Sequence, residues 1–152
     1  MEQTKIKAHL SPAKPTQLDL QTQFEMEVPF HDVDSMHIVW HGHYWKYFEL
    51  ARTQWFRSIN YDYPEMDRTG FVWPVTDCQC RYIKPMTYGM KIRIVISLLE
   101  YEFRIKLGYL VHDMTSGKKI CKASTIQVPI NWKTKEMCMG SPDILLERLG
   151  LK

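Results

Sequence analysis

The alternation of hydrophobic and polar positions predicts one strand, one long helix and then a run of strands. From Gln23 to Phe30 apolar and polar residues alternate, which is the period of two typical of a half-buried strand. Between Gly42 and Arg57 apolar residues recur at steps of four, three and four, and therefore share one helical face: Tyr44, Phe48, Ala51 and Trp55. Further Tyr and Trp residues surround this face, and we expect the helix to be buried nearly all round.

The second half of the chain has the pattern of β structure. Asn60, Pro64 and Gly70 interrupt the helical pattern and predict a loop. Four strand-like stretches follow, with a turn at 115–118: residues 71–82, 92–98, 103–111 and 120–130. A short helix is expected over 142–149. One apolar helix followed by several strands predicts an α+β fold, in which an antiparallel sheet presents one face to the helix.

Length and composition favour one globular domain. The chain has 152 residues, of which 45% are hydrophobic, and this is enough material for a single core. Residues 1–22 contain two prolines and no sustained period, so we expect an N-terminal extension there and the domain over residues 23–152. The net charge of +3 is too small an excess to indicate nucleic acid as a partner.

The sequence contains no segment typical of membrane insertion or secretion. No apolar stretch reaches the ~18–20 residues that span a bilayer, and the N-terminus lacks the apolar core of a signal peptide. We therefore expect a cytoplasmic protein with no membrane association. In that compartment the four cysteines are expected to be thiols.

The most unusual segment lies just before the predicted helix. Between His31 and Tyr44 the chain places two aspartates and four histidines, at a loop of the kind that commonly carries binding and catalytic groups. A metal site is one interpretation, because His37 and His41 have the i, i+4 spacing of some helical zinc sites. Nucleophilic catalysis by Ser35 is another, although no Gly-x-Ser-x-Gly motif surrounds it.

A third interpretation uses a carboxylate close to the start of the helix. The unpaired N–H groups and the dipole at residues 40–43 would stabilise an oxyanion, while Asp32 or Asp34 attacks the substrate or activates water. This arrangement suits acyl transfer. The alternative without chemistry is that the two aspartates only shape and cap the turn.

The same segment resembles a known enzyme family. The chain is similar to the 4-hydroxybenzoyl-CoA thioesterase branch of the hotdog-fold superfamily, which includes bacterial acyl-CoA thioesterases. The resemblance covers about residues 23–149 and rests on three strings: Asp32-x-Asp34-x-x-x-Ile38-Val39-Trp40-x-x-x-Tyr44-x-x-x-x-Glu49-x-Ala51-Arg52, Tyr82-Ile83-Lys84-Pro85-x-x-Tyr88-Gly89 and Ala123-x-Thr125-x-x-Val128-x-Ile130-Asn131.

The resemblance implies a hotdog fold, with an antiparallel sheet wrapped around one long central helix, that assembles as a homodimer or homotetramer. It also implies hydrolysis of an acyl-CoA or acyl-carrier-protein thioester to a free acid and a thiol, without a metal or an organic cofactor. Asp34 matches the family's catalytic carboxylate, which acts as nucleophile or general base. The backbone N–H of His41 matches the group that polarises the thioester oxygen.

Other residues follow from the same resemblance. Glu49 is the second candidate for catalyst, but it lies eight residues beyond His41, or roughly 12 Å along a helix. We expect it to form an ion pair or hydrogen bond instead, with a residue such as Arg52. The expected substrate-binding residues are His37, Trp40, Tyr44, Lys84 and Lys118, the two lysines for CoA phosphates. His37 stands where many members of the family carry glycine.

Two functional alternatives remain open at this point. The same fold would serve as a non-catalytic module that binds acyl thioesters or an acyl carrier protein in a lipid or polyketide pathway. A hotdog dehydratase is the other, although a His-Phe-Pro-Gly-like string is missing from the sequence.

Overall fold

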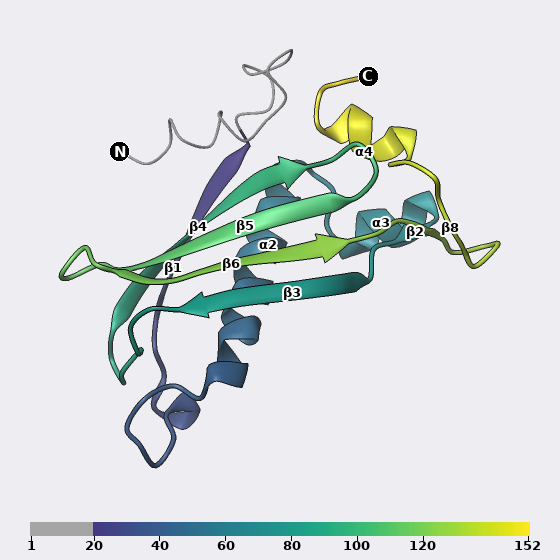
Figure 1. The fold of residues 1–152 in the computed structure, drawn as a ribbon. Coiled ribbons are helices and arrows are strands. Elements are labelled where there is room, and N and C mark those ends of the chain that lie inside the picture. The colour runs from purple at the N-terminus through teal and green to yellow at the C-terminus, as the bar shows by residue number, and fades with distance from the viewer. Residues whose placement is uncertain (1–19) are drawn as a thin grey trace.

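A five-stranded antiparallel sheet forms the main layer of the fold. The computed structural model describes residues 20–152, and residues 1–19 lie outside the described part. The strand order is β1-β4-β5-β6-β3, which leaves β1 and β3 at the two edges (Figure 1). The bounds are β1 Gln21–Glu27, β3 Val75–Tyr82, β4 Lys91–Glu100, β5 Ile105–Asp113 and β6 Lys119–Gln127.

The long helix α2 packs on one face of this sheet. It spans Tyr44–Ser58 and is preceded by a 3-10 turn, η2, at His41–His43. All of the predicted core positions of the helix are buried: Tyr44, Phe48, Ala51 and Trp55. They meet the alternating inner residues of β4, which are fully buried: Ile92, Ile94, Ile96 and Leu98. The predicted α+β fold, a sheet packed on one central helix, is therefore confirmed.

The expectation that α2 is buried nearly all round was wrong. Lys46, Glu49, Leu50 and Gln54 are exposed on the side of the helix that faces away from the sheet. The sheet covers one side of a helix, and the many aromatic residues of α2 gather on that side. Apolar content alone therefore overestimated how much of the helix is covered.

The predicted loop between Asn60 and Gly70 contains a helix, α3, at Tyr63–Thr69. The Asp62 side chain caps it by accepting the N–H of Tyr63, Pro64 lies in its first turn, and Gly70 ends it with φ of 93°. The prediction was wrong because proline and glycine disrupt the interior of a helix but are favourable at its first turn and just beyond its end.

Short elements complete the fold. The 3-10 turn η1 spans Phe30–Asp32, and a second, three-stranded sheet is formed by β2 Phe71–Val72, β7 Ile130–Asn131 and β8 Glu136–Met137. The expected C-terminal helix is α4, Asp143–Arg148. The first strand begins two residues before the predicted start, and the extension expected over residues 1–22 stays a prediction because most of it lies outside the described residues. No helix within residues 20–152 is long and apolar enough to cross a membrane.

Candidate active site

A tight hairpin carries Asp34. A single antiparallel bridge joins Val33 to Val39, the Asp34 N–H donates to Ile38 O at 2.9 Å, and the His37 N–H donates to Asp34 O at 2.9 Å. His37 adopts φ of 67°, in the left-handed region. A turn closed by one left-handed residue is a common three-residue hairpin loop, and glycine suits its last position best. A histidine therefore adopts here the left-handed backbone that glycine adopts most easily.

The two oxygens of the Asp34 carboxylate differ in their surroundings. Oδ1 accepts the N–H of Met36 at 2.8 Å, which is the turn-capping role expected of an aspartate here. Oδ2 has no hydrogen-bond partner among the described residues, and the side chain is only half-buried. Asp34 therefore shapes the turn with one oxygen and leaves the other available for chemistry.

The start of the long helix supplies free N–H groups beside this hairpin. The first acceptors of the η2 turn are Trp40 O and His41 O, and they take the N–H groups of His43 and Tyr44. The N–H groups of His41 and Gly42 therefore have no partner within the helix. The Trp40 N–H donates to Asp32 O at 3.3 Å, which ties the helix start to the last residue of η1, just before the hairpin. The positive end of the helix dipole lies at the same place.

Gly42 allows the Trp40 side chain to approach the helix start closely. A Cβ added to Gly42 would lie 2.2 Å from the Trp40 indole, so the ring lies directly over the first turn of the helix. Trp40 is 50% exposed, and its ring also stacks edge-on to His43. An indole held in this position is suited to cover a ligand bound at the helix start.

The end of β3 closes the other side of the helix start. The Tyr82 hydroxyl donates to His41 O at 3.3 Å, and its ring stacks edge-on against Tyr44 at 4.8 Å. Burial raises the pKa of Tyr44 to about 12, with Cys121 and other neighbours adding to the rise, so its hydroxyl stays neutral. The structure thus brings the predicted residues Trp40, His41 and Tyr44 together.

The sequence prediction missed the role of Asp32, which is almost completely buried. Its carboxylate accepts hydrogen bonds from Lys46 Nζ and Tyr47 Oη, both at 2.6 Å, and His43 Nε2 lies 3.9 Å away. Burial tends to raise the pKa of Asp32, but the hydrogen bonds from Lys46 and Tyr47 outweigh it and hold the pKa below its usual range. Asp32 therefore anchors the hairpin to the first turns of α2. A Lys-Tyr pair just inside the helix was the available signal.

The two predicted CoA-binding lysines lie at the same end of the sheet. The Lys84 N–H donates to Ile120 O at 2.9 Å, just beyond the end of β3, and Lys118 lies in the β5–β6 turn, where its carbonyl accepts the Asp113 N–H. The charge of Lys84 helps to lower the pKa of Asp113, after the turn's own hydrogen bonds from Thr115 and Ser116. Both lysines therefore lie at the end of the sheet where β3 ends and β6 begins, together with Asp113.

Glu49 stands apart from this group. It is exposed on the outer side of α2, whereas Arg52 is buried on the sheet side with 8% exposure. The expected pairing of these two side chains was wrong. Residues three apart on a helix are neighbours, but the Arg52 guanidinium lies beside Tyr63 and Tyr109, whereas Glu49 is exposed to solvent. Glu49 forms no ion pair within the part of the chain that the structure describes.

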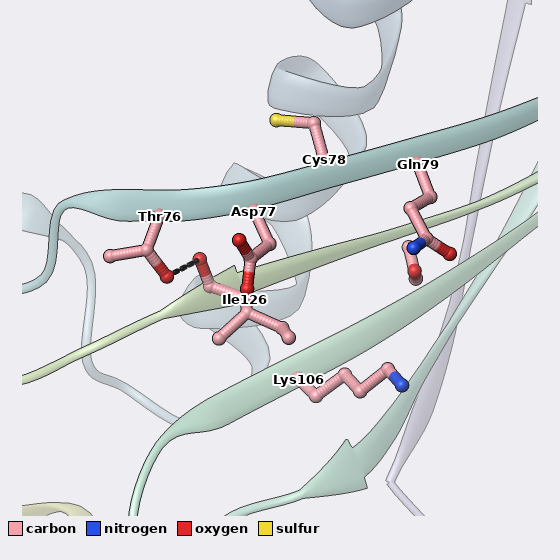
Figure 2. A pocket seen from close by; sticks show the side chains of 7 residues that line it. Thr76, Asp77, Cys78, Gln79, Lys106 and Ile126 are labelled. Atoms are coloured by element: carbon pink, nitrogen blue, oxygen red, sulfur yellow. Dashed lines mark hydrogen bonds between the residues drawn. The ribbon is translucent and has the colours of Figure 1, made fainter.

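The metal site considered from the sequence is not formed in the described part of the chain. Within residues 20–152 no group of three or more His, Cys, Asp or Glu side chains is placed to hold a metal ion, and the cysteines are free thiols. A pocket of about 360 Å³ lies along β3, β5 and β6, and it contains none of the predicted site residues. Figure 2 shows Asp77 and Gln79 on its side of β3, whereas Cys78 points to the opposite side of the strand.

Comparisons with known proteins identify the family of this chain. The family model described as "Thioesterase-like superfamily" matches residues 28–148. "Putative acyl-CoA thioesterase YneP" of Bacillus subtilis (strain 168) is 28% identical over 70% of this chain and 78% of its own length. A DHNA-CoA thioesterase from Staphylococcus aureus has a TM-score of 0.72 at 25% identity, covering 78% of this chain and 80% of the other.

The fold also matches that of 4-hydroxybenzoyl CoA thioesterase, whose structure in complex with 4-hydroxybenzoyl CoA has a TM-score of 0.75 at 17% identity and covers 86% of this chain and 99% of that one. The hotdog fold and the family resemblance predicted from the sequence are thereby confirmed. On the extent of the family match and the agreement in fold, the chain belongs to the thioesterase-like superfamily.

Proposed function

We propose that this protein hydrolyses acyl-CoA thioesters to a free acid and a thiol, with Asp34 as the catalytic carboxylate. The observation that carries this proposal is the free Oδ2 atom of Asp34, on a hairpin bonded through its backbone to the segment whose N–H groups at His41 and Gly42 have no helical partner. An acyl transfer reaction needs an attacking or water-activating oxygen and donors for the oxyanion, and these groups supply both.

The reaction has two balanced routes. In one, Asp34 Oδ2 attacks the thioester carbon, the thiolate leaves, and water then hydrolyses the mixed anhydride. In the other, the carboxylate takes a proton from water, and the resulting hydroxide displaces the thiolate. In both routes negative charge develops on the thioester oxygen, where the N–H of His41 contributes on the order of 10²–10³ in rate by analogy with other oxyanion donors.

The other predicted residues would bind the substrate. Trp40 and Tyr44 would form the wall beside the thioester, and His37 stands in the same turn as Asp34, where an imidazole donor would reach the leaving group or solvent. Lys84 and Lys118 would bind the phosphates of CoA. An acyl carrier protein is the alternative to CoA as the carrier of the acyl group. Its acidic surface would bind the same two lysines.

A second copy of the chain is part of the proposal. All but one of the residues of the edge strand β3 are exposed, and an exposed edge offers unpaired backbone groups to another strand. We expect β3 to pair with a second copy, as a homodimer or homotetramer in the cytoplasm. Light scattering on the purified chain measures this directly.

A thiol-release assay tests the function. The wild-type protein is offered short, medium, long and aromatic acyl-CoA esters, and the same acyl groups on acyl carrier protein. Release of free thiol on at least one ester supports hydrolysis and identifies the carrier. Tight binding with the thioester intact after hours would instead indicate the non-catalytic binding module.

A further inference from the structure

Two thiols meet on the face of the sheet that carries α2. Cys80 lies on the edge strand β3, and Cys121 lies on the neighbouring strand β6. Cys80 pairs with Ala123, two positions from Cys121, so both side chains point to the same face. Cys121 is fully buried in the core, whereas Cys80 packs against the core and stays partly exposed. Of these two sulfurs, only that of Cys80 is open to a reagent in solution.

Contact between the two thiols favours a negative charge on Cys80. A hydrogen bond from the Cys121 thiol lowers the pKa of Cys80, burial opposes this effect, and the Tyr82 hydroxyl adds to the lowering. The neighbouring Cys80 and burial both raise the pKa of Cys121, which therefore keeps its proton and stays the donor. The thiolate, rather than the thiol, is the form that attacks a disulfide. Cys80 is therefore the reactive member of the pair.

The Cys80 thiol adjoins the start of α2, where the proposed function places the thioester. Tyr82 lies two residues beyond Cys80 on the same face of β3, and its hydroxyl, which interacts with Cys80, donates to His41 O at 3.3 Å. The Tyr82 ring stacks edge-on against Tyr44 at 4.8 Å. Both cysteines also contribute to the raised pKa of Tyr44. A single side chain, Tyr82, thus connects Cys80 to the backbone at the candidate oxyanion site.

The proposed reaction releases a thiol at this same place. In both routes the sulfur of CoA leaves a carbon held at the N–H groups of His41 and Gly42, so the CoA sulfur lies at the start of α2. CoA disulfide, the oxidised form of this product, carries the same phosphates that Lys84 and Lys118 would bind. Its binding would therefore bring a disulfide sulfur close to Cys80.

We propose that Cys80 is a modification site at which CoA disulfide forms a mixed disulfide, and that the attached CoA blocks the active site until a thiol removes it. The Cys80 thiolate attacks one sulfur of CoA disulfide, a bond forms between Cys80 Sγ and that sulfur, the bond between the two CoA sulfurs breaks, and the second CoA leaves as a thiolate. The inference rests on the proposed function for the binding of CoA, and Cys80 takes no part in hydrolysis.

The mixed disulfide should persist rather than resolve into an internal disulfide. Diagonal neighbours on two antiparallel strands, such as Cys80 and Cys121, have Cα atoms roughly 7–8 Å apart. This separation exceeds the span of most disulfides, so Cys121 would need a shift of the backbone to displace the CoA. Cys121 is also buried and protonated, which disfavours its attack.

Mass spectrometric peptide mapping after brief treatment with CoA disulfide identifies the cysteine that reacts. Cys78 is the matched control, because it lies two residues before Cys80 on the same face of β3 and is more exposed (Figure 2). Exposure alone predicts that Cys78 reacts first, whereas our inference predicts that Cys80 gains the mass of one CoA first. Because binding brings the sulfur close, CoA disulfide should modify Cys80 about tenfold or more faster than glutathione disulfide does.

Thioesterase activity provides a second measurement. Wild-type protein modified at Cys80 should lose activity, and dithiothreitol should restore it. Cys80→Ser should keep the activity of the untreated wild type and resist CoA disulfide. Cys78→Ser should remain as sensitive to CoA disulfide as the wild type.

The outcomes separate this inference from the proposed function. Preferential modification of Cys80 in a protein that cleaves no thioester would refute hydrolysis and support the modification site. Earlier modification of Cys78, an equal rate with glutathione disulfide, an internal disulfide without added CoA, or inhibition that persists in Cys80→Ser would overturn the inference even where acyl-CoA esters are hydrolysed. Should Cys80→Ser fail to fold, the order of modification in the wild type still decides.

Discussion

Asp32 offers the sharpest test of how the active-site hairpin is held in place. The change Asp32→Asn keeps the shape of the side chain and removes its charge. The carboxylate is buried, and it accepts hydrogen bonds at 2.6 Å from Lys46 and from Tyr47. If these two hydrogen bonds anchor the hairpin, the amide should weaken both contacts at once.

The expected loss of unfolding free energy depends on how exposed the two hydrogen-bond donors are. The Tyr47 hydroxyl is buried, and a hydrogen bond to a charged acceptor contributes about 1.5–3 kcal/mol. The Lys46 side chain is 52% exposed, so its ammonium returns to water and its share is only about 0–1 kcal/mol. We therefore expect Asp32→Asn to lower the free energy of unfolding by about 2–3 kcal/mol. Tyr47→Phe should cost about 1.5–3 kcal/mol, and the double variant should cost less than the sum.

The pH dependence of stability tests the contribution of the Asp32 carboxylate independently. The pKa of Asp32 is lower in the folded protein than in the unfolded chain, so its contribution is complete above the unfolded value of about 3.9 and is lost as pH falls through the folded-state pKa. Asp32→Asn should remove this part of the acid sensitivity.

Urea unfolding of wild type and variant between pH 2 and pH 7 measures both effects. With an m-value of about 2 kcal/mol/M, the midpoint at neutral pH should fall by about 1–1.5 M. A variant within about 0.5 kcal/mol of wild type, with the same loss of stability in acid, would show that Asp32 does not anchor the hairpin.

Three further predictions concern the same end of the molecule. His37→Gly should raise the free energy of unfolding by up to about 1 kcal/mol, because φ of 67° disfavours a side chain; a lower melting temperature would contradict this. Gly42→Ala should displace the Trp40 indole, which would otherwise lie 2.2 Å from the new methyl group, and shift its fluorescence; an unchanged emission spectrum would refute the packing. Lys84→Ala with Lys118→Ala should raise KM about fivefold for acyl-CoA but not for acyl-pantetheine, which lacks the nucleotide phosphates, and equal effects on both would exclude phosphate contacts.

Periodicity predicted most of the fold because the core is regular. Tyr44, Phe48, Ala51 and Trp55 lie on the buried face of one helix, and the alternating residues of β4 lie on the face beneath it. The elements that were missed depend on local chemistry. The helix α3 was missed because proline and glycine destabilise the interior of a helix but are favourable at its ends, where Pro64 and Gly70 lie.

The candidate site was predicted only in part, for a similar reason. The segment around Asp34 and His41 stood out because polar residues are dense there, and spacing along the chain was enough to place it before the helix. Contacts between distant residues leave no such pattern. Neither the anchoring of Asp32 by Tyr47 nor the burial of Arg52 follows from spacing, because both depend on which side of α2 faces the sheet.

The role of the Asp34 carboxylate in the reaction is decided by comparing kcat of the Asp34→Asn and Glu49→Gln variants. Both variants exchange one carboxylate for an amide, and both are assayed on the acyl-CoA ester that the wild type cleaves best, with the dissociation constant of a non-hydrolysable analogue measured alongside. If Asp34 is the catalytic carboxylate, Asp34→Asn should lower kcat by about 10³-fold or more with binding retained, while Glu49→Gln should stay close to wild type. Wild-type kcat in Asp34→Asn, or its loss in Glu49→Gln alone, would contradict it.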